Sequence, residues 1–138
     1  MKSKIPVCLL SVLATSYVSA APFEECPSKA FLIQGTPAQM FGIDLVSAKA
    51  TVLAPSLNFS DETNNESVNA VGFNYKDQYM YGFSKQSPKS VVKIGDDYQL
   101  ERLVVNGLPD TNFYVGDIHV NSETNQAVYY LYHPKFGL

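Results

Sequence analysis

The hydrophobic pattern along the chain is a series of short runs rich in β-branched and aromatic residues, separated by turn-forming residues. No window of eleven or more residues combines apolar positions at helical spacing with a suitable helix cap. The pattern predicts nine strands, at residues 30–35, 39–45, 50–54, 68–75, 78–84, 90–95, 99–105, 113–120 and 126–133. Nearly all are joined by short connections, which predicts an all-β fold with antiparallel neighbours, because parallel pairs need a long crossover.

A similarity between distant segments indicates a repeat. Val71-Gly72 and Val115-Gly116 are 44 residues apart, and each pair is followed by a polar turn and a tyrosine-rich strand. Residues 41–54 and 92–104 also correspond, since each reads as strand, tight polar turn, strand. Units of about 40 to 50 residues with four short antiparallel strands are typical of β-propeller blades. We therefore predict an incomplete propeller with blades at residues 26–54, 68–105 and 113–138, its tyrosine rings filling the gaps between sheets; a single sandwich or meander is the alternative.

The predicted strands supply fewer blades than the four to eight or so of a closed propeller. Either further blades lie outside this chain, or the strands form an open stack whose edges another chain covers. The polar segment 55–67 has no periodicity and is predicted to be an exposed, mobile loop. It carries two glycosylation sequons, at Asn58 and Asn65.

The first twenty residues read as a secretory signal. Lys2 and Lys4 precede an apolar run, and small residues end at Ala20, where cleavage is expected. The run is short and interrupted for a membrane span, although an uncleaved anchor is the alternative, and no later segment is long enough. We expect a secreted or cell-surface protein with one domain at residues 21–138.

Charge and cysteine content limit the kinds of partner that we expect this protein to bind. Removing Lys2 and Lys4 with the leader takes the formal net charge from -3 to -5, and no block of basic residues exists. This argues against nucleic acid or an anionic membrane as partner. Cys26 is the only cysteine after the leader, so it is either a buried small hydrophobe or paired with a cysteine outside this chain.

No familiar catalytic motif is present, and no catalytic residue is predicted. His119 and His133 are the only histidines. Asp117 and His119 share one face of a strand, which makes them a weak ligand-binding pair, but an exposed polar strand face has the same pattern.

Four carboxylates lie in or beside predicted turns: Asp77, Asp96, Asp97 and Asp117. Calcium takes six to eight oxygen ligands from such loops, so these residues form a weak candidate calcium site. Asp-rich turns are also favoured because the side chain hydrogen-bonds to nearby backbone, and this interpretation is preferred.

Tyrosines and glycines also invite functional interpretations. Exposed tyrosine rings stack on sugars, and Tyr98, beside the Asp96-Asp97 turn, is the ring that we expect to be presented to a ligand; the other tyrosines are expected mostly in the core. Strand glycines can allow a ligand to approach, but bulges and tight sheet packing are the preferred explanation. They are Gly72, Gly82, Gly95 and Gly116.

Several motifs carry a resemblance across most of residues 26–120: a Cys-Pro entry, "AFL" at 30–32, "FGIDL" at 41–45, "VNAVGFN" at 68–74, "YMYG" at 79–82 and "VGD" at 115–117. In these the chain resembles a family of propeller-like repeat domains of unknown function, found near the start of secreted and surface proteins, chiefly microbial. The resemblance implies an extracellular β-propeller module and no established catalytic residues.

The predicted function is a secreted, non-enzymatic binding or surface-attachment module with a protein or glycan partner. The alternatives are a propeller-type hydrolase or lyase with its active site at the end of the channel, and a truncated fragment of a larger surface protein. An enzyme would gather ionisable residues from different blades around one pocket, Asp117 and His119 among them.

Overall fold

The computed structural model describes residues 21–23, 29–59, 65–86 and 88–135. In these ranges the chain is all-β, and no helix there could cross a membrane. The strands are β1 (Lys29–Gln34), β2 (Gln39–Asp44), β3 (Ala50–Ala54), β4 (Asn58–Phe59), β5 (Val68–Asn74), β6 (Tyr79–Ser84), β7 (Ser90–Ile94), β8 (Gln99–Leu103), β9 (Val115–Val120) and β10 (Ala127–Tyr132). Nine of them match the nine predicted strands to within two residues at each end.

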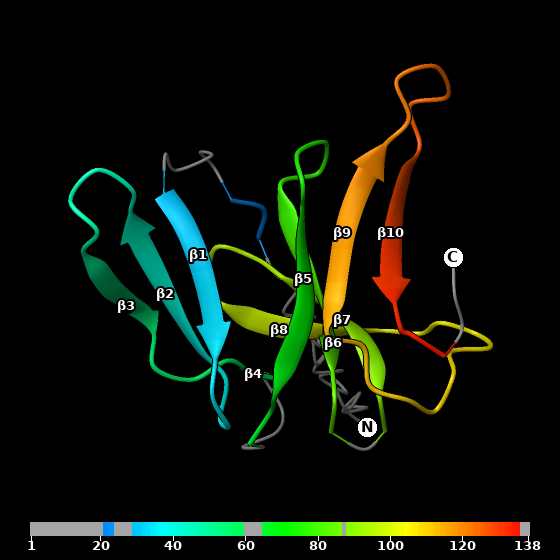
Figure 1. The fold of residues 1–138 in the computed structure, drawn as a ribbon, viewed down its shortest axis with the longest axis horizontal. Coiled ribbons are helices and arrows are strands. Elements are labelled where there is room, and N and C mark those ends of the chain that lie inside the picture. The colour runs from blue at the N-terminus through cyan, green and yellow to red at the C-terminus, as the bar shows by residue number, and fades with distance from the viewer. Residues whose placement is uncertain (1–20, 24–28, 60–64, 87, 136–138) are drawn as a thin grey trace, which may run out of the picture.

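The strands form three sheets (Figure 1). Sheet I has the order β1-β2-β3, sheet II the order β4-β8-β7-β6-β5, and sheet III pairs β9 with β10. Strand β5 contacts both β1 and β9, so it lies between sheets I and III near the middle of the molecule. All pairs except β4–β8 are antiparallel, which confirms the expected all-β, antiparallel class.

The segment 55–67 corrects one prediction. Instead of a wholly exposed loop, it contains β4, which pairs parallel with β8, and its Leu57 and Phe59 side chains are buried. Glu66 is buried as well, and the Ser84 hydroxyl donates a hydrogen bond to its carboxylate. Two apolar side chains in a polar segment were sufficient to bring it into the core; residues 60–64 lie outside the described part.

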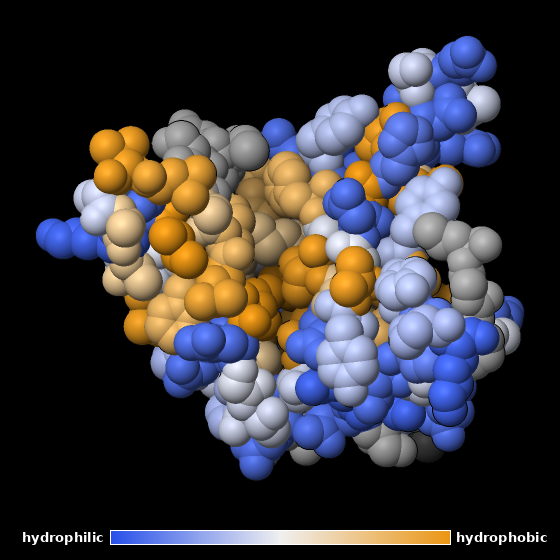
Figure 2. All heavy atoms as spheres, viewed as in Figure 1, coloured by the Kyte–Doolittle hydropathy of each residue, from blue (hydrophilic) through white to orange (hydrophobic). Residues whose placement is uncertain are grey.

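Sheet II is buried on both faces. Between sheets I and II lies the main core, made by Phe23, Ala38, Met40, Ala54, Leu57, Phe59, Val68, Met80, Val92, Ile94 and Leu100. Ala70, Phe83 and Phe113 form a smaller core between sheets II and III. Because side chains alternate between the two faces of a strand, β6 sends Met80 into one core and Phe83 into the other. Hydrophobic side chains also gather on the exposed surface over β1, β2 and β3 (Figure 2).

Three hairpins share one turn device. In each, an Asp or Asn side chain at the start accepts backbone N–H bonds from inside the turn, and the residue four positions later has positive φ. The starting residues are Asp44, Asn74 and Asn121, and the positive-φ residues are Ala48, Gln78 and Asn125. Corresponding turn positions in sheets II and III are therefore 47 residues apart, since Asn74 corresponds to Asn121.

The two Val-Gly pairs are not equivalent positions, although they are 44 residues apart. A side chain on Gly72 would point at the backbone of Ile118, 3.0 Å from its nitrogen, and one on Gly116 would overlap the Ala70 carbonyl. The two glycines thus face each other across the seam between β5 and β9. As predicted, close packing of strands explains them; a Cβ on Gly82 would likewise lie 2.6 Å from a methyl carbon of Val68.

Gly116→Ala is expected to destabilise the fold by about 1–3 kcal/mol, because the added methyl group meets backbone that cannot move independently. Urea unfolding followed by circular dichroism measures the change. Gly42→Ala is the matched control, since its new methyl group would meet only the side-chain end of Leu53 at 3.2 Å. Equal losses in the two variants would contradict the close approach of β5 and β9.

Candidate functional site

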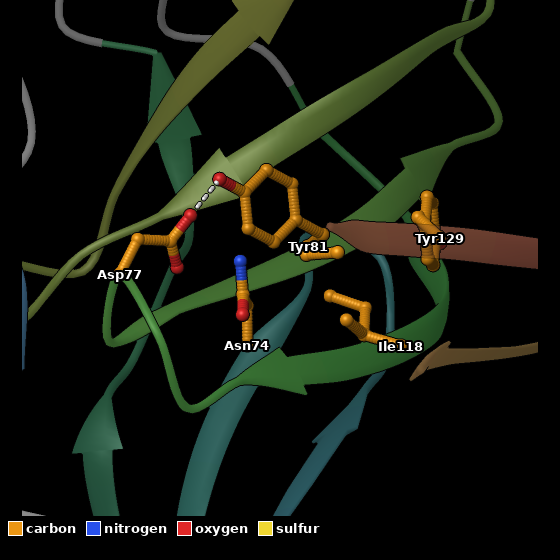
Figure 3. A pocket seen from close by; sticks show the side chains of 6 residues that line it. Asn74, Asp77, Tyr81, Ile118 and Tyr129 are labelled. Carbon is orange, nitrogen blue, oxygen red and sulfur yellow. Dashed lines mark hydrogen bonds between the residues drawn. The ribbon is translucent and has the colours of Figure 1, made fainter. Parts of the chain in front are cut away.

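A pocket opens between sheets II and III, near the hairpin ends of both (Figure 3). Its volume is about 240 Å³, and it is open to solvent on one side. Sheet II and its turn contribute Asn74, Asp77 and Tyr81; sheet III contributes Ile118, Ala127 and Tyr129. The lining therefore combines a carboxylate, an amide and two phenol rings with two aliphatic side chains.

The β5–β6 turn fixes the carboxylate of Asp77. Its Oδ1 accepts a hydrogen bond from the backbone N–H of Tyr79 at 3.1 Å, and its Oδ2 accepts one from the Tyr81 hydroxyl at 2.6 Å. Each oxygen retains room for a further donor, since an ionised carboxylate has about four acceptor positions. The carboxylate is thus held in place with acceptor capacity toward the pocket.

Asn74 supplies the complementary donor. Only 6% of the residue is exposed, and its Oδ1 accepts the backbone N–H of Lys76 at 3.1 Å. Its amide nitrogen points toward the space between Asp77 and Tyr81 (Figure 3), and it has no hydrogen-bond acceptor among the described residues. Because the pocket is open to solvent, this donor is available to water or to an acceptor group of a ligand.

Two tyrosines from different sheets form the aromatic wall. The ring centroids of Tyr81 and Tyr129 are 6.4 Å apart, with the planes tilted by 42°. The hydroxyl of Tyr129 donates to the Ala70 carbonyl. This is the predicted packing of tyrosine rings in the gap between two sheets.

Both hydroxyls stay protonated at neutral pH. Burial raises the pKa of Tyr129 far above its usual value. Burial, and to a smaller extent the hydrogen bond to Asp77, also raises the pKa of Tyr81.

A lysine links the two hairpin ends beside the pocket, since the Lys76 ammonium group donates a hydrogen bond to the Asn125 carbonyl. The formal charge within the lining is therefore the single negative charge of Asp77.

The residues singled out by sequence lie apart from one another. Tyr98 is half-buried and packs against the main core, with its ring 6.3 Å from that of Phe23, rather than standing free. Asp117 and His119 are exposed on β9, on the face opposite Ile118, which lines the pocket. Ligand binding by these three residues stays a prediction.

Of the four candidate calcium ligands, Asp77 and Asp97 act as turn residues, whereas Asp117 lies within strand β9. Asp97 accepts the backbone N–H of Gln99 at 3.0 Å, and Asp117 accepts that of Ile118 at 2.8 Å, as Asp77 does with Tyr79. Within the described ranges, no three His, Cys, Asp or Glu side chains come together in a group that could hold a metal ion. Calcium binding stays an untested prediction.

Two residues of the pocket, Asn74 and Tyr129, were not predicted from the sequence. Asn74 had a usable signal, because it is an amide residue between a strand and a polar turn, and such residues often accept backbone N–H bonds, as Asp44 and Asn121 also do. Tyr129 had none, since Tyr129, Tyr130 and Tyr132 differ only in which face of β10 each occupies.

Two other predictions can be located only in part. Cys26 lies outside the described residues. Of the two sequons, Asn65 is exposed, whereas Asn58 is half-buried in β4 and its amide donates to the Ser56 hydroxyl at 2.8 Å. Asn65 is therefore the more accessible of the two.

The fold and the pocket define an all-β repeat protein whose sheets stack face to face. Residues 31–134 match the family described as a repeat of unknown function, DUF6923. The match covers well over half of the chain, which therefore belongs to this family, as the motif resemblance indicated. Comparisons with curated proteins and with solved structures gave no match.

Tyr129→Phe is expected to lower the free energy of unfolding by about 1–3 kcal/mol, because it leaves the Ala70 carbonyl without its side-chain donor. Tyr130→Phe is the matched control, since this neighbouring ring is 48% exposed. Urea denaturation of both variants measures the difference. Equal stability of the two would mean that the bond to Ala70 does not hold sheet III.

Stability is also expected to fall at alkaline pH. Tyr81 and Tyr129 have a raised pKa in the folded state, whereas both titrate near 10 in the unfolded chain. The unfolded state then releases protons first, so the stabilisation is complete below about pH 10 and is lost as pH rises above it. The double variant Tyr81→Phe, Tyr129→Phe should show a shallower loss between about pH 9 and pH 11 in thermal unfolding; an unchanged slope would contradict the assignment.

Proposed function

We propose that this protein is an exported, non-enzymatic binding module of β-propeller type, which takes a sugar residue of a glycan in the pocket between sheets II and III. The observation that carries the proposal is the lining: a fixed carboxylate, an amide donor directed into the pocket, and aromatic rings.

Export is supported by the packing that follows the expected cleavage point. The carbonyl of Ala21 accepts the backbone N–H of Asp96 at 2.9 Å, and the N–H of Phe23 donates to the Gln78 carbonyl at 2.9 Å. Phe23 is buried against the rings of Phe31 and Phe73. The residues that directly follow the expected cleavage point thus take part in the fold of the mature chain.

A propeller-type architecture is supported by sheet II and by the contacts of first strands. Strands β5 to β8 form a four-stranded antiparallel meander, which is the strand arrangement of a blade. Sheets I and III pack on its two faces, and β5 packs along β9, its counterpart in sheet III. In a propeller, the first strands of successive blades likewise lie side by side near the axis.

A sugar matches the chemistry and the size of the pocket. Sugar hydroxyls donate to a carboxylate and accept from an amide, and a sugar's apolar face packs on an aromatic ring. A cavity of about 240 Å³ is smaller than the 300–1,000 Å³ of sites for drug-sized ligands, so a single monosaccharide ring is the expected occupant. The negative charge of Asp77 favours neutral sugars over acidic ones.

The absence of catalytic convergence at this pocket supports binding rather than hydrolysis. Its lining contains one carboxylate and no histidine, and Asp117 and His119 lie on the other face of β9. Glycoside hydrolysis usually needs two carboxylates on either side of the scissile bond. We therefore favour the module over the hydrolase or lyase alternative.

The direct test is a titration of the mature chain, residues 21–138, with glucose, galactose and N-acetylglucosamine, each followed by the NMR signal of the Asn74 side-chain amide. Binding in the millimolar range, worth about 4 kcal/mol, is expected for at least one of these sugars. Asp77→Asn keeps the turn bond at Oδ1 but removes the charged acceptor, and should weaken binding about tenfold.

Asp97→Asn is the matched control, because Asp97 makes the same kind of turn bond but does not line the pocket. It should leave sugar binding unchanged. If none of the three sugars shifts the Asn74 amide, or if both Asp variants bind equally weakly, the pocket is not the sugar site.

A further inference from the structure

The outer face of sheet I is apolar, and no element among the described residues covers it. We call the face of sheets II and III that packs on the preceding sheet the front, and the opposite face the back. For sheet I, which has no preceding sheet, the back is the face that packs on sheet II, and the front is the face that points away from it. The front of sheet I carries six apolar side chains and no charged one: Ala30, Leu32, Phe41, Ile43, Ala50 and Val52. Leu32 and Val52 are 40% and 54% exposed, and Figure 2 shows hydrophobic side chains over these strands. An apolar sheet face of this extent marks an interaction surface.

Inside the molecule, the corresponding front face is covered. Ile43 in sheet I corresponds to Ile94 in sheet II, because Ile43 precedes the β2–β3 turn as Ile94 precedes the β7–β8 turn, and Phe41 corresponds to Val92. Ile94 and Val92 are completely buried in the main core, against which Phe31 and Ile33 from the back of sheet I also pack. The front of sheet II is thus an established packing surface, and the front of sheet I is its equivalent, without a partner among the described residues.

The back of sheet III is the matching open face. With Asn74 equivalent to Asn121, Tyr81 and Phe83 on the back of sheet II correspond to Val128 and Tyr130 on sheet III. Tyr81 and Phe83 pack against sheet III, whereas Val128, Tyr130 and Tyr132 are 42–48% exposed. The back of sheet III therefore presents large apolar and aromatic side chains and no later sheet to receive them among the described residues.

We propose that the back of sheet III of one copy docks on the front of sheet I of a second copy. The contact continues the back-to-front stacking that already joins sheet I to sheet II and sheet II to sheet III. Asp117 and His119 of β9 share this face, directly across from Tyr130 and Val128, and they border the contact in which Tyr130 and Tyr132 of β10 meet the uncharged face. The two surfaces differ, so the association is head-to-tail and builds rings or open chains rather than a symmetric dimer.

The test compares the mature wild-type chain with two single variants by light scattering after size-exclusion chromatography. Val52→Lys places a charge on the front of sheet I, and Tyr130→Lys places one on the back of sheet III. The wild type should exceed monomer mass at about 50 μM and dissociate on dilution, whereas each variant should associate at least tenfold more weakly. Circular dichroism confirms that both variants are folded.

Mixing the two variants gives the decisive result. The back of sheet III is intact in Val52→Lys, and the front of sheet I is intact in Tyr130→Lys, so the mixture should form a 1:1 dimer and nothing larger. Val46→Lys is the control, because Val46 is 99% exposed but lies on the β2–β3 turn outside both faces; it should associate like the wild type.

Three outcomes would overturn the proposal. The first is a wild-type chain that stays monomeric at the same concentration, and the second is variants that associate like the wild type but do not pair as a 1:1 mixture. The third is wild-type aggregation that does not reverse on dilution, which would instead favour a fragment whose open faces belong to a larger protein. Sugar binding is measured separately, so its failure does not bear on these results.

Discussion

The arrangement of sheets II and III depends on one backbone carbonyl, that of Ala70. A bulge in β5, between Asn69 and Gly72, gives Ala70 positive φ and takes it out of the ladder to β6. The carbonyl then accepts the Tyr129 hydroxyl from β10, and it does so directly beside Gly116. Only glycine leaves room at that point, so the hydrogen bond and the close packing of β5 on β9 require each other.

This contact also determines the pocket. Tyr129 reaches Ala70 with its hydroxyl, and its ring consequently stands opposite Tyr81, on the same side of the seam as Asn74 and Asp77. The β5–β6 turn that presents these two polar residues is fixed by their own side-chain bonds to backbone. A rigid turn and a rigid seam together hold the polar and aromatic groups at fixed separations, which is what selective binding of a small ligand requires.

The stacking of sheets gives the molecule a polarity that a sandwich lacks. Each sheet has a front and a back, and two of the three sheets place their back on the front of the next. The end faces are unequal, since the front of sheet I is uncharged and the back of sheet III mixes tyrosines with Asp117 and His119. Two unlike open faces on a stack account for the head-to-tail contact proposed above, and the same property is what distinguishes a repeat unit from a closed domain.

Local chemistry determined the strands, the turns and the class of fold, because strand alternation and turn-forming side chains act over a few residues. Neighbouring residues alone predicted the nine strands, the turn role of Asp77 and Asp97, and the repeat family. They also predicted that close packing of strands explains Gly72 and Gly116. Long-range packing determined the rest. Nothing near Tyr98 shows that Phe23 will cover its ring, and nothing near Leu57 and Phe59 shows that sheet II will bury them. The pocket itself joins residues more than forty positions apart, so it exists only once β5 and β9 have met over the Ala70 carbonyl.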